Sequence, residues 1–186
     1  MIRIFIAAAI SDVVRLRLAA VQSELKTISS GVRWVKPNNI HLTLVFLGDI
    51  DESMIIPISK SLDRVGCEHV SCAIEVKGLG FFGSPQAPRV IWAGLHGNIV
   101  PITAVYKQII TSVQNTGCHL DTKPFKPHLT LGRVRSPRKE KLLAVAIDSK
   151  KDKSFGRLDI PCVLLMKSDL ASDGPVYTVL HESRLQ

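Results

Sequence analysis

The amino-acid sequence predicts an α+β protein in which short strands and helices alternate irregularly. Three observations lead to this prediction. Apolar runs of strand length are interspersed with stretches whose apolar residues recur at helical spacing. At least two strands follow each other as a hairpin-like pair, which favours mixed or antiparallel sheets over a doubly wound parallel sheet. The 186 residues are 46% hydrophobic and 22% charged, as in a folded chain of one domain or two small lobes sharing a core.

The individual elements follow from turn residues and from hydrophobic spacing. Strands are expected where apolar runs are bounded by turns, at residues 1–10, 40–47, 70–76, 90–95, from 128 onward, 160–166 and 176–180. Helices are expected where apolar residues lie three and four positions apart, at residues 12–31, 51–65, 99–113 and 137–147. Ser11 or Asp12 should cap the first helix, and Pro57 should either lie in the first turn of the second or break it. The Gly- and Pro-rich residues 78–88 are expected to form a loop, and Gly174-Pro175 a turn.

The charge balance favours a polyanionic partner. The chain has 24 Lys and Arg against 16 Asp and Glu, a net charge of +8, and basic side chains bind nucleic acids by neutralising phosphates. The longest uncharged apolar stretch, residues 4–11, is far below the roughly 20 residues that span a bilayer. We therefore expect a cytoplasmic protein without membrane association.

The spacing of the cysteines and the absence of familiar catalytic motifs argue against several classes of enzyme. Cys67, Cys72, Cys118 and Cys162 form no CxxC pair and do not lie at zinc-ligand spacing with histidines, so we expect reduced, mostly buried thiols. The chain has no Gly-rich phosphate loop, HExxH or GxSxG motif. It is therefore not expected to be a P-loop enzyme, a zincin or an α/β-hydrolase.

One four-residue sequence occurs twice. His41-Leu42-Thr43-Leu44 recurs as His128-Leu129-Thr130-Leu131, and chance is a poor explanation in a chain with only six histidines. Each tetrad lies in an expected strand, where side chains alternate, so His and Thr share one face and the leucines point to the other. Two such strands would bring two imidazoles and two hydroxyls to one groove.

These four polar side chains suit phosphoryl chemistry without a metal ion. One neutral histidine can take a proton from an attacking water while a second, protonated histidine gives one to the departing oxygen. Histidine suits both tasks because its ordinary pKa is near 6.5, and threonine hydroxyls can donate to phosphate oxygens. No Cys, Asp or Glu lies near the two histidines at ligand spacing, so a metal site is the weaker interpretation.

The sequence resembles the two-histidine phosphoesterase superfamily, and within it the RNA 2′,3′-cyclic phosphodiesterase branch, also called LigT-like or 2′-5′ RNA ligase proteins. The resemblance covers essentially the whole chain and, beside the tetrads, includes residues 3–7, 32–35, 88–94, 125–127 and 170–180. It implies a single bilobal α+β domain over residues 1–186. In that fold two antiparallel sheets, related by a pseudo-two-fold axis, surround a central cleft, and the helices lie outside.

The resemblance also implies an activity and a set of site residues. The activity is opening of RNA or nucleotide 2′,3′-cyclic phosphate ends to 2′-phosphates, with ATP-independent 2′-5′ RNA joining as a reverse reaction and with no metal or other cofactor. His41 would protonate the leaving 3′ oxygen and His128 would activate the water, while Thr43, Thr130 and Arg133 would hold the phosphate. No obligate protein partner is implied, and the duplication within one chain favours a monomer.

Simple strand alternation conflicts with the role of Arg133, because it sends Gly132 into the cleft and Arg133 to the opposite face. A β-bulge at Gly132, or the end of the strand there, would turn Arg133 back. Trp34, Phe46 and Tyr177 are candidates for stacking a terminal base.

Two other functions remain open from the sequence. The chain could be a catalytically idle module that binds RNA ends in a basic groove. It could also be a phosphodiesterase for 2′-5′ oligonucleotides or for cyclic nucleotide-sugar phosphates, because the tetrads do not distinguish these substrates.

Overall fold

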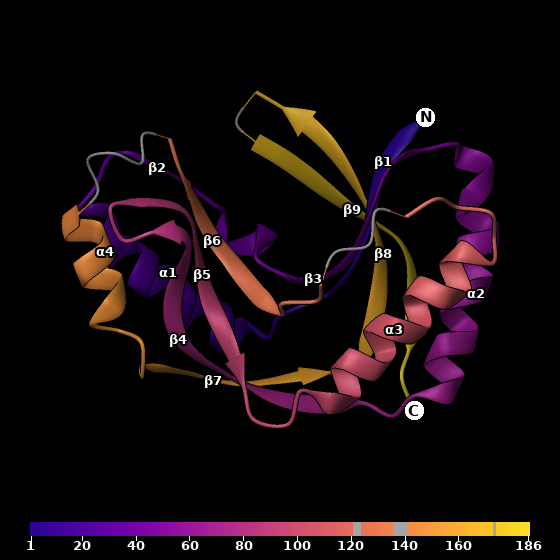
Figure 1. The fold of residues 1–186 in the computed structure, drawn as a ribbon. Helices are drawn as coiled ribbons and strands as arrows, with labels where there is room; N and C mark the ends of the chain where they lie inside the picture. Colours follow the sequence, from indigo (N-terminus) through magenta and orange to yellow (C-terminus); the bar gives the residue numbers. More distant parts are fainter. Residues whose placement is uncertain (121–123, 136–140, 173) are drawn as a thin grey trace.

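The computed structural model describes residues 1–120, 124–135, 141–172 and 174–186 (Figure 1). Its helices are α1 (Asp12–Lys26), α2 (Ile55–Glu68), α3 (Val100–Gln114) and α4 (Lys141–Asp148), with short 3-10 helices η1 (Pro37–Asn39) and η2 (Glu52–Met54). Its strands are β1 (Ile2–Ala8), β2 (Val32–Trp34), β3 (Leu42–Ile50), β4 (Cys72–Ser84), β5 (Ala87–His96), β6 (His128–Val134), β7 (Ser154–Ile160), β8 (Cys162–Ala171) and β9 (Gly174–Arg184). The α+β prediction is confirmed.

The described strands form one curled sheet, in which the neighbours are antiparallel in the order β7-β4-β5-β6-β3-β1-β8-β9, and β2 also pairs with β6. The expectation of two separate sheets is therefore corrected. The two are joined because β3 and β6 pair near the start of each strand, with Leu42 opposite Leu129. We call β3-β1-β8-β9 the His41 half and β6-β5-β4-β7 the His128 half.

The helices cover the outer sides of the two halves, as expected (Figure 1). In the His41 half, α2 packs against β8 and β9, and α3 packs against α2 and β3. In the His128 half, α1 packs against β7 and α4 against β4. Each half is therefore a sheet layer with a helical layer, and the junction of β3 with β6 lies between them.

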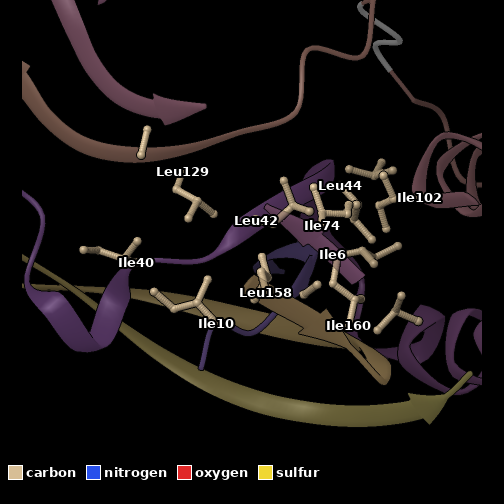
Figure 2. Close-up of a cluster of buried hydrophobic side chains, with 14 of the residues drawn as sticks. Ile6, Ile10, Ile40, Leu42, Leu44, Ile74, Ile102, Leu129, Leu158 and Ile160 are labelled. Carbon is tan, nitrogen blue, oxygen red and sulfur yellow. The ribbon is translucent and has the colours of Figure 1, made fainter. Parts of the chain in front are cut away.

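The junction is built on buried leucines. Leu42 and Leu129 have no exposed surface, and Figure 2 shows both in a cluster with Ile6, Ile74 and Leu158. Burying apolar surface contributes about 25 cal/mol per Å², so this cluster strongly stabilises the approach of the two halves. The fold thereby fixes where the two tetrads meet.

Residues 78–88 are not a loop, contrary to the prediction. They belong to the hairpin of β4 and β5, which turns between Ser84 and Ala87. Glycine serves a packing need here: a Cβ on Gly80 would lie 2.3 Å from the Trp92 ring on the neighbouring strand. A cluster of glycines predicts a loop from sequence, whereas this position needs the close approach that glycine allows.

Other boundaries also differ from the prediction. The first helix ends at Lys26 rather than near residue 31, because the Thr27 amide bonds back to the Glu24 carbonyl and tightens the last turn. Gly174 and Pro175 begin β9 instead of forming a turn, and β7 was not predicted. The predicted helix at 137–147 is present from Lys141, and residues 137–140 lie outside the described residues.

The cysteines are free thiols, as expected, but they are less buried than predicted. Only Cys118 is buried, Cys72 and Cys162 are half-buried, and Cys67 is exposed on α2. Among the described helices, none combines the length and the apolar character needed to cross a membrane.

Candidate active site

The two tetrads present their polar side chains on one face of the sheet. All four tetrad leucines are buried, with exposed fractions between 0% and 5%. The histidines and threonines between them, His41, Thr43, His128 and Thr130, are half-buried. The predicted alternation of side chains is therefore confirmed.

The register brings the two tetrads into direct contact in opposite directions. Because Leu42 pairs with Leu129 in an antiparallel ladder, the next positions place His41 opposite Thr130 and Thr43 opposite His128. Residues opposite each other have Cβ atoms about 5 Å apart and lie on the same face of the sheet. Each histidine thus stands beside the threonine of the other tetrad.

His41, just before β3, is held by a hydrogen bond and by aromatic rings. Its Nδ1 donates to the Asn39 carbonyl at 2.8 Å, which leaves Nε2 for proton exchange. Its ring stacks on Phe5 with centroids 4.8 Å apart and meets the edge of Tyr177 at 5.3 Å. Burial lowers the pKa of His41, the bond to Asn39 opposes this shift, and the positive charge of His128 lowers the pKa further.

His128 opens β6 and repeats the same hydrogen bond. Its Nδ1 donates to the Lys126 carbonyl at 2.6 Å, so Nε2 is again free for chemistry. Its aromatic contact is the edge-to-face approach of Phe82, with centroids 5.0 Å apart. Because His128 lowers the pKa of His41, the two imidazoles lie close enough to interact electrostatically.

A cavity of about 420 Å³ adjoins the tetrads. Four of the five residues predicted from sequence line it: His41, Thr43, Thr130 and Arg133. His128 does not line the cavity, and it lies beside Thr43, the lining residue opposite it in the ladder. The three predicted base-stacking residues, Trp34, Phe46 and Tyr177, also line this cavity.

Arg133 faces the cavity because β6 carries the expected irregularity. Thr130 pairs with Trp92 and Gly132 pairs with Ile91, so β6 has one extra residue, Leu131, relative to β5. The extra residue restores Arg133 to the face of Thr130. The positive charge of Arg133 also opposes the rise that burial causes in the pKa of Tyr177.

Several residues of the site were not predicted from the sequence. Asn39 supplies the carbonyl for His41, and its side-chain amide donates to the Pro175 carbonyl at 2.7 Å, which ties η1 to β9. The buried Gln22 amide donates to the carbonyls of Val35 and Leu131 and fastens α1 to β6 and to the residue that follows β2. The only sequence signal for Asn39 was its place two residues before a tetrad.

The cavity is electropositive. Arg3, Arg33, Lys36 and Arg133 line it, and no Asp or Glu is among its described lining residues. Arg3 is already paired with Asp49 at 2.7 Å. Across the described part of the chain, no three His, Cys, Asp or Glu side chains group as metal ligands. The arrangement can bind an anion and transfer protons at it.

Comparison with known proteins identifies the family. Residues 9–92 match the family model described as LigT like Phosphoesterase. A relative from Archaeoglobus fulgidus, named RNA 2′,3′-cyclic phosphodiesterase, is 33% identical over 94% of this chain and 96% of its own length. The chain belongs to the LigT-like phosphoesterase family. It is accordingly an enzyme, a phosphoesterase.

Other members of the LigT-like family agree over nearly the whole chain. A Thermotoga maritima relative with the same name is 32% identical over 99% of this chain and 96% of its own. A crystal structure from Thermus thermophilus superposes with a TM-score of 0.84 at 26% identity, covering 98% of this chain and 97% of that one. Apo LigT of E. coli shares the fold, with a TM-score of 0.78 at 19% identity over 100% and 98% of the two chains.

Proposed function

We propose that this enzyme hydrolyses 2′,3′-cyclic phosphates at RNA or nucleotide ends to 2′-phosphates, using His41 and His128 and no metal ion. The observation that carries the proposal is the crossed register at Leu42 and Leu129. It sets each imidazole beside a threonine, and both threonines line one electropositive cavity. The substrate class is supported by the relatives, which are named RNA 2′,3′-cyclic phosphodiesterase.

The proposed reaction needs two proton transfers. His128 takes a proton from water as the water oxygen bonds to phosphorus. The bond from phosphorus to the 3′ oxygen breaks, and His41 gives that oxygen its proton. The products are a 2′-phosphomonoester and a 3′-hydroxyl. Each proton transfer contributes typically 10²- to 10⁴-fold, and Thr43, Thr130 and Arg133 donate to the phosphate oxygens as their charge grows.

The environment of His41 adds a requirement to this assignment. Burial lowers its pKa in the free enzyme, so at neutral pH the ring is mainly neutral there. The negative charge of a bound phosphate favours the protonated ring. We therefore propose that the substrate itself helps His41 to hold the proton it later donates.

We infer further that a pseudo-two-fold axis relates the two halves. The segments β1-α1-β3 and β5-α3-β6 each run from a strand through a helix to the antiparallel neighbour of that strand, and each leads to a tetrad.

Both halves of the site then come from residues 1–186 of one chain, so we propose that the enzyme acts as a monomer. If an RNA 5′-hydroxyl replaced the water, the same steps would give 2′-5′ joining.

Phosphorus NMR of a 2′,3′-cyclic mononucleotide in the presence of a chelator tests the proposal. The wild-type enzyme should convert the cyclic phosphate to the 2′-phosphate alone, and the H41N/H128N double variant serves as the blank. Absence of reaction, restoration only by added metal, or formation of the 3′-phosphate would each refute it. Binding of RNA ends without turnover would favour the idle module instead.

A further inference from the structure

Two arginines face the cavity from directly opposite positions. Arg33 on β2 pairs with Arg133 on β6 in an antiparallel register, and both line the cavity. Their Cα atoms are therefore about 5 Å apart, with the side chains on one face. Like charges directly opposite each other destabilise a sheet. An anion between or beside the two guanidinium groups would relieve this repulsion.

The described residues lining the cavity include no Asp or Glu that could offset this charge. The nearby carboxylate of Asp49 is already paired with Arg3. The scissile group does not balance the charge of the two arginines either. A 2′,3′-cyclic phosphate is a diester with a single negative charge. In the proposed reaction Arg133 and one protonated histidine already meet that charge, so the guanidinium of Arg33 remains for a second anion.

The side chain of Arg33 reaches across the cavity to its far wall. Its Nη2 lies 3.9 Å from the position that a Cβ would take on Gly174, at the start of β9. Gly174 lines the same cavity and has no side chain to block this reach. Trp34, the next residue of β2, also lines the cavity. Strand β2 thus presents the guanidinium of Arg33 to whatever extends beyond the scissile phosphate.

We propose that Arg33 binds the phosphodiester on the 5′ side of the terminal nucleotide, so that it selects RNA ends over cyclic mononucleotides. This inference rests on the proposed function. The next negative charge of an RNA substrate is that phosphodiester, one nucleotide from the cyclic phosphate held by Arg133. A planar guanidinium fork suits two oxygens of such a group.

Three substrates separate this role from others: a 2′,3′-cyclic mononucleotide, a dinucleotide with the same cyclic end, and that dinucleotide with a neutral methylphosphonate linkage. At low salt the wild type should show a kcat/KM about tenfold higher for the charged than for the neutral dinucleotide, the effect of one charge-assisted hydrogen bond. In R33Q this ratio should fall to about one. R157Q, which removes an exposed arginine of β7 paired with Asp159, should keep the wild-type ratio.

The remaining outcomes decide against the inference. Equal loss on both dinucleotides in R33Q would place Arg33 at the scissile phosphate, and a wild-type ratio of one would remove the second phosphate contact. The midpoint of thermal unfolding should stay unchanged or rise in R33Q, because a repulsion is relieved, and a marked fall would indicate a structural role.

If the wild type turned over none of the substrates, the proposed function would fail. Fluorescence anisotropy with labelled charged and neutral dinucleotides would then test Arg33 alone, and equal affinities would overturn its role.

Discussion

The same four residues occupy two different environments in this protein. His41 lies between Phe5 and Tyr177, and burial lowers its pKa. His128 makes one edge contact with Phe82 and does not line the cavity. Both rings bond through Nδ1 to the carbonyl two residues earlier. The difference teaches that one local hydrogen bond orients both rings, whereas the surrounding half of the fold decides how closely aromatic side chains enclose each ring.

The largest expected effect is the loss of either histidine. H41N and H128N should each lower kcat for a cyclic nucleotide by about 10²- to 10⁴-fold, because each removes one proton transfer. Steady-state kinetics measures this, and H119N, which changes an exposed histidine outside the tetrads, should leave kcat unchanged. Full activity in either tetrad variant would mean that only one half of the molecule is catalytic.

The junction between the halves should carry much of the stability. L42A and L129A each empty a fully buried position, and each should lower the free energy of unfolding by about 2–5 kcal/mol. Urea titration followed by circular dichroism measures the change. L16A, at a position of α1 that is 70% exposed, should have little effect. Two separate transitions in the wild type would show that the halves fold independently of their junction.

Phe46 offers a smaller test of the cavity wall in the His41 half. Its ring is 67% exposed and lines the cavity, so F46A should raise KM for a cyclic nucleotide about tenfold through lost base stacking, with little change in stability. F46Y keeps the ring and should keep KM. An unchanged KM in F46A would assign base binding to Trp34 or Tyr177, or to no aromatic residue.

The pH dependence gives the most direct comparison of the two histidines. If His41 is the acid, kcat/KM, which reports the free enzyme, should fall with rising pH at a lower pH than kcat, which reports the complex. Y177S admits water to His41 and should move the alkaline limb of kcat/KM to higher pH, since burial is the main cause of the lowered pKa. Y177F keeps the ring and should leave the limb in place. A shift of the acidic limb instead would make His41 the base.

Much of the site followed from local sequence rules. Alternation along a strand was enough to assign His and Thr of each tetrad to one face, and the leucines are indeed buried. The alternation rule failed at Arg133, because the extra residue Leu131 shifts the following side chains of β6 to the opposite face. The loop predicted around Gly80 was wrong. A glycine in the sequence can indicate either a loop or a close approach to a neighbouring side chain, and here it allows the approach of Trp92.

The sequence by itself determined which functional groups are available: two imidazoles, two hydroxyls and many basic side chains, together with the strands that carry the two tetrads. Only the tertiary structure decided that Leu42 meets Leu129, that His41 is enclosed by aromatic rings and that Arg33 stands opposite Arg133. The reason is physical. Side-chain alternation is a property of a few neighbouring residues, whereas register, burial and charge repulsion depend on segments far apart in the chain that come together only on folding.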